Sequence, residues 1–173
     1  MEIFKGQNLI EFAERFKTDE DCKKYLSEIK WAEHYVCRKC GHTKSQIRKD
    51  FSRTCNICSD TESSTANTLF HKVKFGLRKS FFMCFEMATT TKSRSASQMS
   101  IRYGVHKRTT RLFMHKVHET MKSSEDFPMK GIVNVDEFCY RINRSQSKDV
   151  IFNNLITRIV KSDNILHKDL ICG

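Results

Sequence analysis

The stretch that decides the fold is Cys37-Arg-Lys-Cys40, followed after fourteen residues by Cys55-Asn-Ile-Cys58. Each Cys-x-x-Cys pair is typical of a tight knuckle that points two thiolates at one centre, and a hairpin between the pairs would bring the two knuckles together. Four thiolates complete a tetrahedron around Zn²⁺ at about 2.3 Å and leave no open position for a substrate. The sequence therefore predicts a zinc ribbon with a structural Zn²⁺ held by Cys37, Cys40, Cys55 and Cys58.

Two disulfides or a pair of redox motifs are the alternative interpretation of these cysteines. The first residues, Met1 to Gly6, lack the basic and then apolar pattern of a secretory signal peptide, which favours a reducing cytoplasm in which disulfides are rare. Zinc is therefore preferred, and a cytoplasmic location is expected. His42 adjoins the first knuckle, but four cysteines already fill the tetrahedron, so we expect it outside the ligand set.

Positive charge is concentrated in two parts of this 173-residue chain, whose net charge is +11. Residues 37–58 hold six Lys or Arg against one Asp or Glu, and residues 71–122 hold twelve against two. Such patches attract polyanions, of which nucleic acid is the commonest. A membrane surface would need a basic amphipathic helix with an exposed apolar face, and a merely solvated basic face is the third alternative. No apolar run approaches the roughly 18 residues of a membrane span, so no membrane partner is expected.

Segments with helical periodicity precede and follow the ribbon in the sequence. Residues 8–30 predict two short helices, with Asn8 and Thr18 in N-cap positions and apolar residues at helical spacing behind them. Residues 77–88 predict another helix, with Glu86 outside its apolar face. The ribbon is therefore expected to lie between helical segments.

Residues 95–114 predict a helix-turn-helix, in which one helix ends at Gly104-Val105 and the next begins near His106. Met99 and Ile101 are expected to be buried in the first helix. The residues expected to line the second are Val105, Thr109, Leu112, Phe113 and Val117. Those left exposed, where this motif meets base edges in the major groove, are Lys107, Arg108, Thr110 and Arg111. A plain helical hairpin is the alternative, because Gly-Val also joins such helices.

A β-branched alternating run, Gly131-Ile-Val-Asn-Val-Asp136-Glu137, predicts a strand that ends in two acids. Surface Asp-Glu pairs are common, so the order of the parts carries more information than the acids alone. A helical lead, a Cys-x-x-Cys-Gly ribbon, a basic helix-turn-helix and this strand follow one another over residues 9–138. In combination they resemble the zinc-ribbon insertion-sequence transposases of the DDE type.

The resemblance implies double-stranded DNA as the partner, specifically the terminal repeats of a bacterial mobile element, and it allows a homo-oligomer. It also implies a ribonuclease-H-like catalytic domain in which three acids hold two Mg²⁺ ions for in-line phosphoryl transfer. Asp136 matches the first of these acids.

The chain departs from the family after Asp136. Where family members continue into a Gly-Gly-containing turn, this sequence reads Phe138-Cys-Tyr-Arg, and the remaining acids are Asp149, Asp163 and Asp169. Residues 139–173 are too few to bury the core of a ribonuclease-H-like domain, which needs on the order of a hundred residues. The expectation is a truncated, inactive catalytic domain.

The expected fold class is α+β in several parts. These are a helical lead (1–36), the zinc ribbon (37–70), a helix-turn-helix DNA-binding domain (71–124) and the truncated start of a catalytic domain (125–173). The expected function is the DNA-binding portion of a transposase; a stand-alone DNA-binding regulatory protein is the alternative. The cations expected to contact phosphates are Lys92, Arg94, Lys72, Lys74, Arg38, Lys39, Lys44, Arg48 and Lys49.

Overall fold

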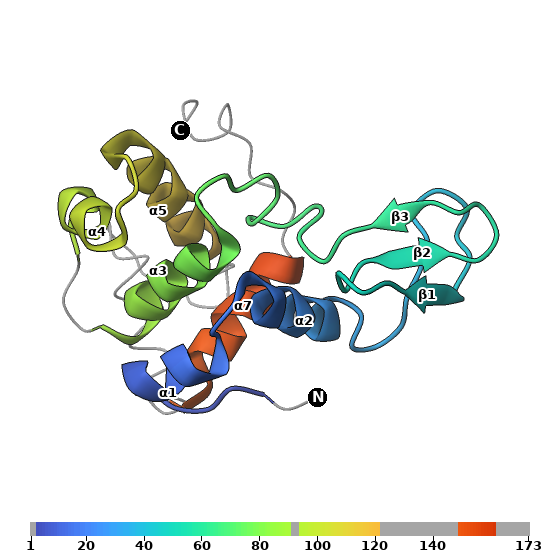
Figure 1. The fold of residues 1–173 in the computed structure, drawn as a ribbon, viewed down its shortest axis with the longest axis horizontal. Helices are drawn as coiled ribbons and strands as arrows, with labels where there is room; N and C mark the ends of the chain where they lie inside the picture. The colour runs from blue at the N-terminus through green and yellow to red at the C-terminus, as the bar shows by residue number, and fades with distance from the viewer. Residues whose placement is uncertain (1–2, 91–93, 122–148, 162–173) are drawn as a thin grey trace, which may run out of the picture.

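The computed structural model describes residues 3–90, 94–121 and 149–161, in which helices form one body and a small antiparallel sheet lies beside it (Figure 1). This arrangement confirms the α+β class. In chain order the elements are α1 (Leu9–Arg15), α2 (Asp19–Lys30), β1 (Ser45–Ile47), β2 (Arg53–Cys55), β3 (Thr61–Glu62), α3 (Leu77–Thr89), α4 (Ala96–Tyr103), α5 (Lys107–Met121) and α7 (Ile151–Lys161).

The N-caps predicted from the sequence begin the first two helices. The amide of Ile10 donates to Asn8 Oδ1 at 2.9 Å. At the start of α2 the amide of Asp21 donates to Thr18 Oγ1 at 3.2 Å, and the amide of Thr18 donates back to the Asp21 carboxylate at 2.8 Å. The Thr18 amide lowers the pKa of Asp21, because it stabilises the ionised carboxylate. These local bonds satisfy amides that have no partner within the helix.

One apolar core holds the helical body together. Phe12 of α1 stacks on Phe85 of α3, with ring centroids 4.1 Å apart, and meets Phe152 of α7 edge to face at 4.9 Å. The same core takes buried side chains from α2, α4 and α5. At its edge the Tyr25 hydroxyl donates to Asn153 Oδ1 at 2.7 Å, a bond that joins α2 to α7.

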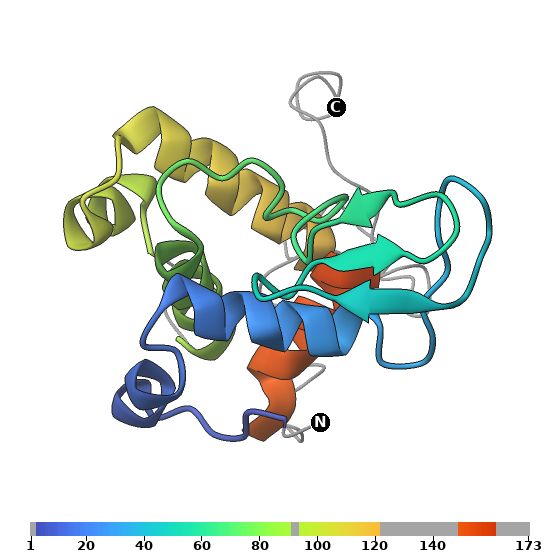
Figure 2. The same cartoon turned by 45° about the vertical axis from the view of Figure 1, so that its right-hand side comes forward.

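The helix α7 is an element that the sequence analysis did not predict. It lies against α2, α3 and α5 in both views (Figures 1 and 2). Four of its apolar side chains are at most 1% exposed: Phe152, Leu155, Ile156 and Ile159. Residues from the segments 1–36, 71–124 and 125–173 therefore share one core.

The sheet has the strand order β1-β2-β3, with both pairs antiparallel. Trp31 and Tyr35 pack with Cys37 and Cys55 into a second, smaller cluster beneath it. So small an apolar cluster cannot stabilise a fold by itself, and such ribbons depend on metal binding for their folding energy.

Lys30, the last residue of α2, ties the ribbon to the helical body. Its ammonium donates to the carbonyls of Ser63 at 3.2 Å and Ala66 at 2.8 Å, and it pairs with Glu62 Oε1 at 2.7 Å. Burial lowers the pKa of Lys30, although Glu62 opposes this shift. The Glu62 carboxylate also meets Arg38 at 3.3 Å. A mostly buried ion pair therefore fixes where the ribbon sits.

Candidate metal centre and nucleic-acid interface

Two tight turns carry the four cysteines. In the first turn, the amide of Gly41 donates to the Cys37 carbonyl and the amide of Cys37 donates to the His42 carbonyl, both at 2.8 Å. In the second, the amide of Ser59 donates to the Cys55 carbonyl at 3.1 Å. Gly41 and Ser59 both adopt left-handed backbone angles, with φ of 73° and 57°, which close the two turns. Each pair is thereby a knuckle, as the spacing predicts.

The knuckles bring the four sulfurs within 4.8 Å of one another. The Sγ atoms of Cys37 and Cys58 are 3.5 Å apart, as are those of Cys40 and Cys55. A tetrahedral Zn²⁺ with bonds of about 2.3 Å would set its sulfurs about 3.8 Å apart, so this donor set fits a closed structural zinc site.

Backbone amides favour the thiolate forms that zinc requires. The amides of Cys40 and Lys39 lower the pKa of the Cys37 thiol to about 6. The amide of Cys58 likewise lowers the pKa of Cys55. Each knuckle therefore stabilises one sulfur anion, while burial and the neighbouring thiols raise the pKa of Cys40 and Cys58.

An aromatic layer covers the inner face of the sheet. The Arg53 guanidinium lies 5.0 Å from the ring centroid of Trp31 and 5.8 Å from that of Tyr35. Both rings are buried. Cation–π contacts of this kind add to packing where water is excluded, so this face of the ribbon has a structural role.

A short turn at Gly104 joins α4 to α5. Gly104 has a left-handed conformation with φ 60° and ψ 42° and ends α4. The amide of Val105 donates to the Ser100 carbonyl at 3.1 Å, and the Ser100 hydroxyl donates to the Val105 carbonyl at 2.7 Å. This pair of bonds fixes the angle at which α5 leaves α4.

The first turns of α5 present Lys107, Arg108 and Arg111 to solvent as predicted, and Val105, Phe113 and Val117 are buried as predicted, but two threonines are exchanged. Thr110, expected to be exposed, is 0% exposed and donates its hydroxyl to the Val105 carbonyl at 3.4 Å. Thr109, expected to line the interior, is exposed. Ile101, expected to be buried, is 84% exposed, whereas Met99 is buried as predicted. The exposed polar residues at this end of α5 are His106, Lys107, Arg108, Thr109 and Arg111.

Comparison with known families assigns one part of the chain. Residues 17–61 match the family model of the transposase zinc-ribbon domain. The matched segment includes α2, whose Lys30 pairs with Glu62 of β3, and both knuckles. No curated protein and no solved structure matches the chain.

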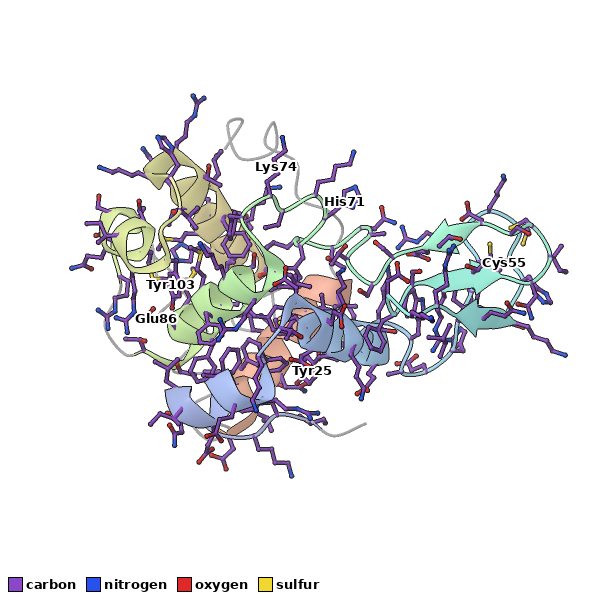
Figure 3. The ribbon with its side chains drawn as sticks, in the orientation of Figure 1. Tyr25, Cys55, His71, Lys74, Glu86 and Tyr103 are labelled. Carbon is purple, nitrogen blue, oxygen red and sulfur yellow. The ribbon has the colours of Figure 1, made fainter. Side chains whose placement is uncertain are left out.

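Outside the matched segment, a buried carboxylate joins α3 to α4. Glu86 Oε1 pairs with Arg94 at 3.1 Å and with Arg102 at 3.3 Å, and the Tyr103 hydroxyl donates to Glu86 Oε2 at 2.7 Å. Figure 3 shows Glu86 and Tyr103 together at this junction. Burial raises the pKa of Tyr103, and the Glu86 carboxylate raises it further. The expectation that Glu86 points away from the core is wrong.

Two predicted residues, Lys92 and Asp136, lie outside the described residues, as does the strand that begins at Gly131. Within the described ranges, no helix is long and apolar enough to cross a membrane. Sequence reasoning missed Lys30 and Glu62 because nothing in their spacing reveals a contact between the end of a helix and an edge strand.

Proposed function

We propose that the chain is the DNA-binding part of an insertion-sequence transposase and that it recognises the element's terminal repeats as double-stranded DNA. The observation that carries the proposal is the match of residues 17–61 to the transposase zinc-ribbon domain. A basic, exposed helix start in the adjoining helical body supports it, because the phosphate backbone is a polyanion.

In this proposal α4 and α5 act as a helix-turn-helix, and the start of α5 enters the major groove. The N-terminal residues of the second helix contact base edges in this motif. Arg108 and Arg111 are exposed there, and an arginine makes a bidentate contact to guanine. Lys107 and Thr109 flank them, while the buried hydroxyl of Thr110 supports the turn instead.

A second group of cations contacts phosphates and positions the protein. Lys72 and Lys74 are exposed on the connection between β3 and α3. Figure 3 shows Lys74 and His71 on this connection. Contacts to phosphates add affinity for every sequence alike.

Salt titrations on two duplexes test this division. One duplex is the sequence that the zinc-loaded protein enriches from a randomised library, and the other is its scrambled version. Arg108→Ala or Arg111→Ala is expected to cost about 1–3 kcal/mol on the enriched duplex and much less on the scrambled one. Lys72→Ala and Lys74→Ala serve as matched controls, with equal losses on both duplexes and a salt slope lower by about one unit. If the arginine variants lost equal binding free energy on both duplexes, α5 would not be the helix that reads the sequence.

The proposal includes no catalysis by this polypeptide. The resemblance matches a single catalytic acid, Asp136, and one carboxylate cannot position two divalent ions about 4 Å apart. The expected result is no strand cleavage of the enriched duplex with Mg²⁺ or Mn²⁺. Nicking that Asp136→Ala abolishes would contradict this part.

A stand-alone regulatory DNA-binding protein is the second candidate, and the position of α7 favours it. The helix α7 packs in the helical core against α2, α3 and α5, so a segment assigned to the start of a catalytic domain belongs to the core of the DNA-binding helices instead. The two candidates differ in their target. A transposase fragment selects the repeats that flank its own gene, whereas a regulator selects a site elsewhere.

A further inference from the structure

The ribbon sheet has two faces of different character. Successive residues of a strand point to opposite faces. Gln46 lies opposite Thr54, and Thr54 lies opposite Thr61, so these three residues form one row across the sheet. Pairing continues beyond β1 and β2, because the amide of Asn56 donates to the Lys44 carbonyl at 3.3 Å. Even-numbered residues of β1 and β2 therefore share one face.

The other face is occupied over β2 and β3, whereas Ile47 of β1 on the same face is 64% exposed. Arg53 lies over the Trp31 ring, the Cys55 sulfur belongs to the metal centre, and Glu62 pairs with Lys30. Since these residues point toward the aromatic layer, the row containing Gln46 points toward solvent. We call this the outer face; its residues are Gln46, Thr54 and Thr61 of the strands and Lys44, Arg48 and Asn56, which adjoin them. Ser52, whose carbonyl accepts the Arg48 amide at 2.9 Å, is buried and does not belong to it.

The outer face consists of hydrogen-bonding and cationic side chains. Five of its six residues are exposed, and Thr54 is half-buried. The hydroxyls of Thr54 and Thr61 lie 3.0 Å apart, so one donates to the other and a hydroxyl hydrogen and acceptor lone pairs remain for a ligand. Near Arg48 in the sequence, Asp50 accepts the amide and hydroxyl of Ser52 in the turn.

We propose that the outer face reads base edges of double-stranded DNA, as a reading surface separate from α5. The inference rests on the proposed DNA-binding function and adds a second site of recognition to it. Strands can enter the major groove, where glutamine pairs with adenine through two hydrogen bonds and threonine contacts either a polar edge or the thymine methyl group. Lys44 and Arg48 on either side of Gln46 complement the phosphates.

The positive charge of the ribbon favours nucleic acid as the ligand of the outer face. Residues 37–58 hold six Lys or Arg against one Asp or Glu. Of these cations Lys44 and Arg48 lie on the outer face, whereas Arg53 lies over Trp31 and Arg38 pairs with Glu62. The outer face carries no apolar side chain, whereas a protein interface of similar size needs a buried apolar centre. Its polar row therefore matches groove edges better than a protein or lipid surface.

Selection of binding sites by the full chain, loaded with zinc, tests the inference. A library of duplexes with a randomised segment is enriched separately with wild type, Gln46→Ala, Thr54→Val and Arg111→Ala. Wild type is expected to enrich two blocks of preferred bases. Gln46→Ala should lose discrimination in one block by about 5- to 150-fold, with unchanged affinity for scrambled DNA, and Thr54→Val should weaken the same block. Arg111→Ala should lose the other block.

The neighbouring Ile47 gives a matched control, because it lies on the same strand and the opposite face. Ile47→Ala should enrich the same two blocks as wild type, and every variant should keep one zinc per chain. An unchanged motif for Gln46→Ala and Thr54→Val overturns the inference, and the proposed function stands if Arg111→Ala still loses a block. A wild-type protein that enriches no motif overturns both.

Discussion

At the scale of single residues, Lys30 has the largest expected effect on the junction between ribbon and helical body. Its side chain is 8% exposed and serves the carbonyls of Ser63 and Ala66 together with the Glu62 carboxylate. In the variant Lys30→Met, the buried Glu62 carboxylate would keep Arg38 as a partner but lose the ammonium. The carbonyls of Ser63 and Ala66 would lose their donor. We expect a loss of about 3–5 kcal/mol in the free energy of unfolding, measured by urea denaturation.

The double variant Lys30→Met/Glu62→Leu is the control. Since it removes both buried charges, it should be less destabilised than Lys30→Met alone. A single variant within about 0.5 kcal/mol of wild type would show that the ion pair contributes little, as surface pairs do.

Tyr103 provides a second test at this scale. Tyr103→Phe removes the hydroxyl that donates to Glu86 but leaves Arg94 and Arg102 beside that carboxylate. We expect a loss of about 1.5–3 kcal/mol, because the acceptor is charged and buried. A double-mutant cycle with Glu86→Gln isolates this bond, and a coupling energy near zero would contradict its importance.

At the scale of elements, α4 and α5 depend on the left-handed backbone of Gly104. A Cβ added there would meet only Lys79 Nζ at 3.9 Å, so the effect of a substitution comes from the backbone rather than from a clash. Gly104→Ala should destabilise by about 1–2 kcal/mol, and Gly104→Asn by less, because asparagine tolerates this conformation. Thermal unfolding of the two variants makes the comparison, and equal losses would argue against this explanation.

The elements also show which features a single sequence can predict. The cysteine spacing and the caps at Asn8 and Thr18 are local, so the metal centre and two helix starts were predictable. The choice between Thr109 and Thr110 was not predictable, because the two threonines are adjacent and Thr110 is buried with its hydroxyl on the Val105 carbonyl. The burial of Glu86 depends on Tyr103 and two arginines from elsewhere in the chain, a combination without a sequence signature. The helix α7 was predictable as well, because Phe152, Leu155, Ile156 and Ile159 recur at helical spacing, whereas its packing against α2, α3 and α5 has no local signal.

At the scale of the whole molecule, two separate apolar clusters predict two separate responses to metal loss. Cys37→Ser, or a chelator, should unfold the ribbon and leave the helical body folded, because the binding energy of zinc is folding energy for the ribbon. Trp31 is the one tryptophan of the chain and lies in the ribbon cluster. Its fluorescence should therefore change while the helical circular dichroism signal largely persists.

Metal analysis completes this experiment. Wild type should hold one zinc per chain, and Cys84→Ala should hold the same amount, because Cys84 is buried in the helical core. A wild-type protein that stays folded and free of zinc after purification under reducing conditions would refute the prediction.

The position of α7 also has a consequence for biosynthesis. Its Asn153 meets Tyr25 across 128 positions of sequence. A ribosome that adds about 5–20 residues per second needs roughly 6–26 s to cover this distance. The aromatic side chains of α1 and α2 therefore cannot contact α7 until it has been synthesised. The first and last cysteine ligands, by contrast, lie only 21 positions apart in the sequence. We expect the nascent chain to take up zinc first and to close its helical core last.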